Sequence, residues 1–166
     1  MVKLIVCIDK DGNIGLNNEL LFNIKEDMQF FKEQTTNNLV IMGHNTFLSL
    51  GKRPLPNRFN LVITTDELEP AKNLARVENL AKTVRQYNEN DVRKDLFIIG
   101  GASIYNTAIR KKLADELLIT VVHERVDKAD TSIDMKIVKQ NYKKAETIKT
   151  IKDGERKAAI ERWIRK

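Results

Sequence analysis

The sequence predicts a doubly wound α/β fold, in which a mostly parallel sheet of about eight strands carries helices on both faces. Short runs of apolar residues rich in Ile and Val alternate along the chain with segments of helical periodicity. The apolar runs are continuous, as in strands that are buried on both faces of a parallel sheet. The C-terminal segment differs and has the pattern of an antiparallel hairpin. Together these observations indicate βαβ units with an antiparallel edge.

Five apolar runs are expected to be strands, at residues 3–8, 39–43, 60–65, 96–100 and 116–122. Helical patterns lie between them, at about 24–36, 45–50, 79–88 and 102–111. Near the end of the chain, two strand-like segments flank Asp153-Gly154, a dipeptide typical of hairpin turns. We expect this hairpin to add the antiparallel edge.

Length and composition favour one globular domain over residues 1–166. The chain is 42% hydrophobic and 31% charged, and no apolar run approaches the roughly 20 residues of a membrane span. Cys7 is the single cysteine and the two histidines lie far apart, so neither an internal disulfide nor a metal site is expected. We expect a cytoplasmic protein without membrane contact.

The net charge of +6 comes from the C-terminal segment. Residues 136–166 hold 11 Lys and Arg against 4 Asp and Glu, which gives +7, and the remainder holds 18 against 19, which gives −1. A surface that binds polyanions is one interpretation. A lysine-rich, solvated edge hairpin that resists edge-to-edge pairing is the interpretation that we favour.

Three predicted strand ends present small or hydroxylated residues on one rim of the sheet. Gly100-Gly101 follows one strand and precedes a helical pattern, Gly43 ends another before "HNTF", and Thr64-Thr65 end a third. Backbone at such ends can approach a phosphate closely, and helical N–H groups point at the anion. Each feature alone is typical of a plain tight turn. Together they favour a ligand with several phosphates, such as a dinucleotide.

One carboxylate interrupts the apolar stripe of the first predicted helix. Ile24, Asp27, Met28, Phe31 and Thr35 are spaced by three and four residues, so Asp27 lies where the pattern favours an apolar residue. A first-turn acid favoured by the helix dipole is one explanation. A carboxylate directed at a ligand is the other.

Several segments strongly resemble the dihydrofolate reductase family. They are "LVIMGHNTFLSLGKRPLPNR" (39–58), "IVCIDKDGNIGLNNELLFNIKEDMQFFKEQT" (5–35), "FIIGGASIY" (97–105), and "LLITVV" followed by "DKADTSI" (127–133). The resemblance runs in order over essentially the whole chain. It implies NADPH-dependent reduction of 7,8-dihydrofolate to 5,6,7,8-tetrahydrofolate. It also implies that the protein supports one-carbon metabolism and thymidylate synthesis and is a target of antifolates.

The resemblance assigns roles at the substrate. It implies that Asp27 assists protonation of the pterin, that Thr120 orients Asp27, and that Leu20 and Phe22 belong to the catalytic loop. Arg58 would hold the glutamate carboxylate of the substrate, with Lys52 nearby. The implied substrate-binding residues are Ile5, Cys7, Asp27, Met28, Phe31, Leu50, Lys52, Leu55, Arg58, Ile99, Tyr105 and Thr120. From the residue alone, Cys7 is a buried small hydrophobe rather than a nucleophile.

The resemblance also assigns the cofactor site. The implied NADPH-binding residues are Cys7, Ile14, Gly15, Asn18, Leu20, Gly43, His44, Asn45, Thr46, Thr64, Thr65, Ile99, Gly100, Gly101, Ala102, Ser103, Ile104 and Tyr105. The family holds the two glycines with a cis peptide, which we therefore expect between Gly100 and Gly101.

Three departures from the family pattern affect function. Leu21-Phe22 stands where the family usually has Pro-Trp, so the indole N–H that helps to place a water near the pterin is missing. His44 and Ser103 stand where arginines often pair with the adenosine 2′-phosphate, and Ala102 replaces a frequent Gly.

Two alternatives remain at this stage. A riboflavin-pathway reductase shares the fold, although Asp27, Phe31 and Arg58 fit a pterin that carries glutamate. A non-catalytic polyanion-binding protein would use the basic C-terminal segment. We expect a monomer whose partner is dihydrofolate rather than nucleic acid.

Overall fold

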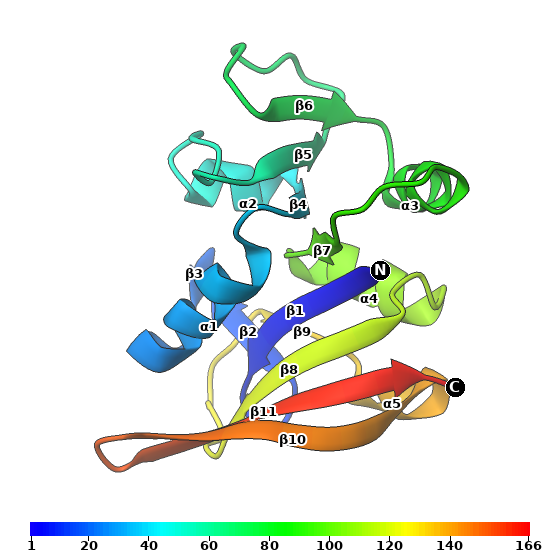
Figure 1. The fold of residues 1–166 in the computed structure, drawn as a ribbon. Coiled ribbons are helices and arrows are strands. Elements are labelled where there is room, and N and C mark those ends of the chain that lie inside the picture. Colours follow the sequence, from blue (N-terminus) through cyan, green and yellow to red (C-terminus); the bar gives the residue numbers. More distant parts are fainter.

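The computed structural model describes residues 1–166 and is built on an eight-stranded sheet (Figure 1). The strand order is β10-β11-β8-β1-β7-β4-β5-β6. The strands from β8 to β6 are parallel to their neighbours, whereas β11 pairs antiparallel with both β8 and β10. The expected mostly parallel sheet with an antiparallel C-terminal edge is confirmed.

The main strands agree with the apolar runs of the sequence. Their bounds are β1 Val2–Ile8, β4 Leu39–Gly43, β5 Phe59–Ile63, β6 Leu74–Val77, β7 Leu96–Ile98, β8 Glu116–Val122, β10 Tyr142–Asp153 and β11 Arg156–Arg165. The helices are α1 Lys25–Thr35, α2 His44–Ser49, α3 Leu80–Glu89, α4 Ala102–Arg110 and α5 Met135–Asn141. Strands β5 and β7 end two residues earlier than predicted, so Thr64-Thr65 and Ile99-Gly100 lie in the loops beyond them.

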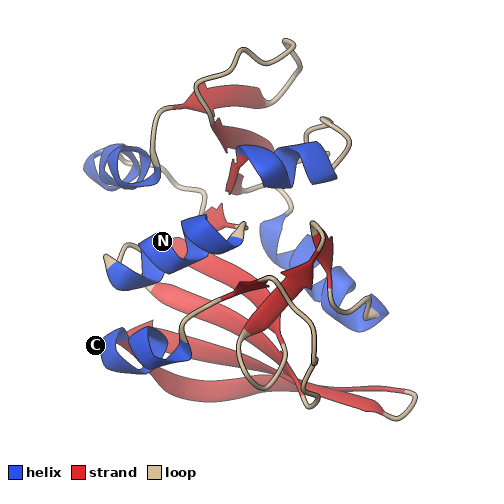
Figure 2. Cartoon of the chain, turned by 180° about the vertical axis from the view of Figure 1, so that it is seen from behind, coloured by secondary structure: helices blue, strands red, loops and turns tan.

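Helices cover both faces of the sheet. Phe30 of α1 and Phe47 of α2 belong to one apolar cluster. Helices α3, α4 and α5 contribute Val84, Ile109 and Val138 to a second cluster on the opposite face. Figure 2 shows α4 and α5 in front of the strands and α1 behind them. Side chains of a strand alternate between the faces, so every predicted strand needs apolar residues at successive positions.

The C-terminal hairpin is a long solvated edge, as the charge pattern indicates. Strand β10 is the outermost strand of the sheet, and most of its side chains are exposed. Asp153 pairs with Arg156, so the two-residue turn is Gly154-Glu155 rather than the expected Asp153-Gly154. Gly154 has a φ of 65°, a conformation that glycine adopts without a steric penalty.

Several short elements were not predicted. Strand β6, helix α5 and a small sheet are among them; the sheet consists of β3 Glu19–Leu20, β2 Asn13–Leu16 and β9 Thr131–Ser132. Two to four residues are too few to show a periodicity, and these strands form only where a partner lies beside them. The small sheet holds the loop 9–23 against residues 127–133.

The strand order reverses direction at β7. From β1 the chain passes to β4 and outward to β6, and it then returns to insert β7 between β1 and β4. Ligands of doubly wound sheets bind beyond the carboxyl ends of the strands at such a reversal. Gly100 lies at this point, directly after β7. None of the five helices has the length and apolar character that a membrane span requires.

Candidate active site

Asp27 meets two strands at the centre of the sheet. Helix α1 lies over the face on which Ile5 and Leu118 are buried, and it directs Asp27 at that face. The Thr120 hydroxyl donates a hydrogen bond to Asp27 Oδ1 at 2.5 Å. Cys7 and Thr120 are register partners across β1 and β8, so their side chains lie together beneath the carboxylate. The helix therefore places the Asp27 carboxylate over two polar side chains, Cys7 and Thr120, in an otherwise apolar surface.

Burial and hydrogen bonding have opposite effects on the pKa of Asp27. Burial raises the pKa of Asp27, and hydrogen bonds from the Thr120 hydroxyl and the Cys7 thiol act in the opposite direction. Burial also raises the pKa of the Cys7 thiol well above its usual value, and the neighbouring Asp27 adds to that rise. Cys7 thus stays protonated and acts as a donor, and it lacks the thiolate that a nucleophile requires.

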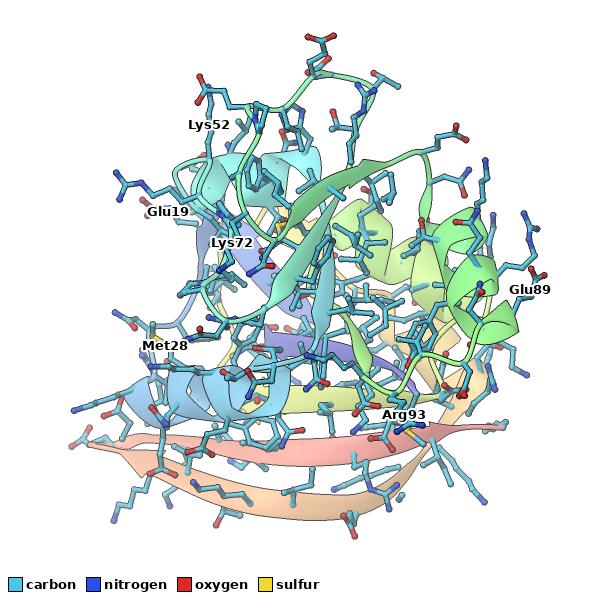
Figure 3. All side chains as sticks on the ribbon, turned by 45° about the horizontal axis from the view of Figure 1, so that its top comes forward. Glu19, Met28, Lys52, Lys72, Glu89 and Arg93 are labelled. Atoms are coloured by element: carbon cyan, nitrogen blue, oxygen red, sulfur yellow. The ribbon has the colours of Figure 1, made fainter.

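Apolar residues from five segments surround the carboxylate. The predicted pocket residues that lie in or against the same apolar cluster are Ile5, Cys7, Phe22, Phe31, Leu50, Leu55 and Ile99. Met28 differs, because 58% of it is exposed at the surface of α1 (Figure 3). Phe30, which the helical stripe omitted, is buried instead. The apolar stripe of α1 is therefore rotated toward Phe30, and Met28 lies at the rim.

Arg58 is a buried cation without an acidic partner. It is 7% exposed, its Nε donates to the Pro56 carbonyl at 2.9 Å, and a terminal nitrogen donates to Thr35 Oγ1 at 3.0 Å. Burial lowers its pKa, and no carboxylate of the chain forms an ion pair with it. A guanidinium has five N–H donors, so three remain for an anion. Lys52 is exposed on the same loop (Figure 3).

The glycine pair lies at the rim of the sheet, shortly after the end of β7. The peptide bond between Gly100 and Gly101 is cis, as expected, and Gly43 N donates to the Gly100 carbonyl at 2.9 Å. A Cβ on Gly101 would meet only Thr46 Oγ1, 3.5 Å away. Helix α4 begins at Ala102, so its first-turn N–H groups, with that of Ser103, lie beside this glycine surface. Donors on an open glycine surface fit an anion such as a pyrophosphate.

Tyr105 connects the two parts of the site from beneath. Its hydroxyl donates to the Ile5 carbonyl at 2.8 Å, and burial raises its pKa far above the usual value. A Cβ on Gly100, whose φ is 124°, would meet the Tyr105 hydroxyl at 3.3 Å. Tyr105 is thus an uncharged side chain that packs beneath Gly100. Ile104 packs similarly close to Gly43.

A third group of polar residues lies at the far end of the rim. His44 Nδ1 is 3.2 Å from the Thr64 hydroxyl and 3.4 Å from an Asp66 carboxylate oxygen. Arg76 donates to the carbonyls of Thr65 and Asp66, each at 3.1 Å. Asn45, Thr65 and Ser103 are exposed around this group. The structure thus brings the predicted cofactor residues of three strand ends to one side. No three His, Cys, Asp or Glu side chains gather as a metal site would require.

Comparisons with known proteins match this arrangement. Residues 1–165 match the family model described as dihydrofolate reductase. The chain belongs to the dihydrofolate reductase family. It is 36% identical over 143 residues to the dihydrofolate reductase of Ureaplasma parvum, with 86% of each chain covered. It is 29% identical to dihydrofolate reductase type 9 of Escherichia coli, over 98% of this chain and 92% of that one.

A solved structure agrees in fold over almost the whole chain. It is the dihydrofolate reductase of Enterococcus faecalis complexed with NADP(H) and RAB-propyl, which matches with a TM-score of 0.83 and 26% identity. The match covers 99% of this chain and 96% of that one. The protein is therefore an oxidoreductase that reduces dihydrofolate with a nicotinamide cofactor of the NADP type.

Two aspartates that sequence reasoning missed hold the loop 9–23 of this reductase. Asp9 is fully buried and accepts hydrogen bonds from Asp11 N, Asn13 N, Asn13 Nδ2 and Val126 N. Asp130 accepts from Asn17 N at 2.9 Å, and its own N–H donates to the Gly15 carbonyl at 3.0 Å. An acid directly after an apolar strand is the signal that could have indicated Asp9.

The predicted residues of the loop 9–23 differ in how much of each is exposed to solvent. Ile14 is buried, and a Cβ on Gly15 would meet the Glu19 carbonyl at 2.7 Å, so only glycine fits between the strands of the small sheet. Asn18 has a φ of 65° at the turn, and Leu20 is 72% exposed. Leu20 is thus the part of the loop that is available to a ligand.

Proposed function

We propose that residues 1–166 form a single reductase domain that converts 7,8-dihydrofolate to 5,6,7,8-tetrahydrofolate with NADPH, and that Asp27 assists protonation. The short hydrogen bond from Thr120 to Asp27, on the sheet face that carries the apolar cluster with Ile5, Phe31 and Ile99, carries this proposal. Burial raises the pKa of this carboxylate, which supports a role in proton transfer.

The roles at the reactive end follow from the donors and acceptors. A carboxylate offers two parallel acceptors, which match the amino group and adjacent ring N–H of a pterin. Thr120 and Cys7 donate to Asp27 and leave its remaining lone pairs for the substrate. When bound, the reduced nicotinamide supplies the hydride. The raised pKa of Asp27 suits a group that helps to deliver a proton to the neighbouring ring nitrogen.

Arg58 is proposed to hold the substrate at its opposite end. The contacts with Pro56 and Thr35 fix the plane of the guanidinium and leave an edge for a carboxylate of the glutamate. Such two-point pairs add geometric specificity as well as energy. Phe31, Leu50 and Leu55 would enclose the substrate between Asp27 and Arg58. Exposed Lys52 and Met28 would contact it only at the rim.

The cofactor assignments are proposals of the same kind. The α4 N–H groups and Gly43 to Thr46 would bind the pyrophosphate, and the nicotinamide would lie between Ile14, Leu20 and Ile99. Thr64, Thr65 and His44 would bind the adenosine 2′-phosphate, which supports NADPH over NADH. Comparing KM for the two cofactors tests this choice. Equal values would contradict it.

The experiment is the turnover assay with its carboxylate variant. We expect oxidation of NADPH, followed by its absorbance, that depends on dihydrofolate. Asp27→Asn is expected to lower kcat/KM at neutral pH by about 10²-fold or more, the usual contribution of a positioned acid or base. Asp134→Asn is a matched control, because that aspartate only caps α5. Retention of full kcat/KM in Asp27→Asn would contradict the role of Asp27.

The polyanion-binding alternative loses support in the structure. Five cations of residues 136–166 are paired with acids: Lys144, Lys149, Arg156, Arg162 and Arg165. Cations engaged in this way add less to a binding surface. We infer a cytoplasmic monomer that does not bind nucleic acid. Size-exclusion chromatography with light scattering tests the monomer, and a dimer mass would contradict it.

A further inference from the structure

Arg156 connects the C-terminal hairpin with the last residues of the catalytic loop. It is the first residue of β11, and its guanidinium carbon lies 5.0 Å from the centroid of the Phe22 ring. Its Nε donates to Glu124 Oε2 at 2.6 Å. Phe22 precedes α1, and Glu124 lies two residues beyond the end of β8. Three segments that are distant in sequence thus meet at one cation.

Phe22 is contacted by an apolar cluster and by one cation. Its ring packs against the same apolar cluster as Cys7 and Phe31, but a phenyl group has no polar atom that could form a hydrogen bond. A cation over the ring face is a contact that depends on orientation. Along the chain, Phe22 lies between the exposed Leu20 and helix α1, which carries Asp27. The position of this ring therefore affects both the loop and the pocket.

Glu124 fixes the guanidinium that contacts Phe22. The side chains of Arg156 and Glu124 are 36% and 41% exposed, so this ion pair borders the pocket rather than lying within it. The charge of Arg156 nevertheless reaches the interior, because it opposes the rise in the pKa of the Cys7 thiol. The charge of Asp153 also acts on Arg156. Arg156 is thus held on one side by an acid and on the other by a ring.

We propose that Arg156, held by Glu124, is a positioning residue that keeps the Phe22 ring at the edge of the pocket and thereby keeps the catalytic loop closed beside Asp27. The proposal rests on the proposed function of this site. It assigns a role to a hairpin residue that contacts neither Asp27 nor Thr120. It also explains how a ring without a donor can stand at this position of the loop.

The test compares Arg156→Gln with a control on the same strand. A cation over an aromatic ring at a half-exposed site contributes about 0.5–1 kcal/mol, so we expect kcat/KM for dihydrofolate to fall about two- to fivefold. Arg162→Gln is the control, because Arg162 is 33% exposed, pairs with Glu146 at 3.2 Å and Glu116 at 3.5 Å, and makes no cation–π contact. It is expected to keep full activity. Arg156→Lys retains the charge and is expected to recover more than half of the loss.

A double-mutant cycle separates positioning from a general structural effect. Phe22→Leu removes the ring and keeps an apolar side chain, so in this background Arg156→Gln should change kcat/KM by less than about 1.5-fold. Phe22→Trp offers a larger ring face and should increase the dependence on Arg156. Equal losses from Arg156→Gln with and without the ring would overturn the proposal, and so would an unchanged kcat/KM in Arg156→Gln.

The two proposals fail in different ways. If the unmodified chain does not oxidise NADPH with dihydrofolate, the proposed function is wrong. If the unmodified chain turns over and the cycle shows no coupling between Arg156 and Phe22, only the positioning role is wrong. Thermal unfolding of each variant is measured in parallel. A loss of activity that follows Tm equally in Arg156→Gln and Arg162→Gln would also overturn the positioning role.

Discussion

Thr120→Val tests whether a single hydroxyl tunes the catalytic carboxylate. The substitution removes the donor to Asp27 Oδ1 and keeps the shape of the side chain. A hydrogen bond to the charged form of an acid favours that form, so the Thr120 hydroxyl lowers the pKa of Asp27. Removal of the hydroxyl must therefore raise this pKa further.

The size of the shift follows from the geometry of the bond. The donor and acceptor are 2.5 Å apart, at the short end for a hydroxyl bonded to a carboxylate, and Thr120 is 3% exposed. A hydrogen bond to a charged group contributes about 1.5–3 kcal/mol. One pKa unit corresponds to about 1.4 kcal/mol. The pKa of Asp27 should therefore rise by about one to two units in the variant.

The assay is the pH dependence of kcat at saturating NADPH and dihydrofolate. Because the proposed role of Asp27 is proton delivery, the rate should fall as the pH rises through its pKa. In Thr120→Val the midpoint of this decline should move upward by about one to two pH units. Thr83→Val is the matched control, since that buried hydroxyl donates to the Asn79 carbonyl at 2.8 Å on the opposite face. A midpoint that stays or moves downward would refute the reasoning.

Two further variants test the anchoring of the substrate by Arg58 and the contribution of Asp9 to stability. Arg58→Gln is expected to raise KM for dihydrofolate about 10- to 150-fold, from the loss of about 1.5–3 kcal/mol, and to change kcat little. Arg53→Gln is the control, because Arg53 is an exposed cation on the same loop. A lowered kcat with unchanged KM would contradict the anchoring role. For Asp9, burial favours the neutral carboxyl, but the bonds from Val126, Asn13 and Asp11 hold its pKa below the usual value. The stability that these hydrogen bonds contribute is fully present above the ordinary pKa of aspartate. It is lost as the pH falls through the lower pKa that Asp9 has in the folded state. Asp9→Asn should therefore unfold at lower urea than the unmodified chain at pH 7 and differ less in acid, and an equal difference at both pH values would contradict this.

The fold was predictable because its principal elements bury apolar surface in a regular pattern. Continuous runs such as residues 116–122 are needed when both faces of a strand are covered, and this need is visible in one dimension. Helix α1 shows the limit of the same reasoning. Its pattern placed Met28 inside and omitted Phe30, because a spacing of three and four allows two stripes that differ by a rotation of the helix. Contact with the sheet selects one of them.

The candidate site was predictable only where function leaves a local mark. Asp27 stands out because a carboxylate interrupts an apolar stripe, and Gly100-Gly101 stands out because a turn follows a buried strand. Asp9 leaves only a weak mark, an acid directly after an apolar strand, and Asp130, Glu124 and Arg156 leave none. Each is an ordinary charged residue next to a turn, and its partners lie in other segments.

The sequence by itself therefore determined the α/β class, the family, and the residues proposed to carry the reaction. Only the tertiary structure decided which of them meet: Thr120 reaches Asp27 across 93 positions of the chain, and Arg156 reaches Phe22 and Glu124 from the hairpin. The physical reason is the range of the forces involved. Burial and periodicity act on neighbours along the chain, whereas hydrogen bonds and ion pairs at this site depend on strand pairing and helix packing between distant segments.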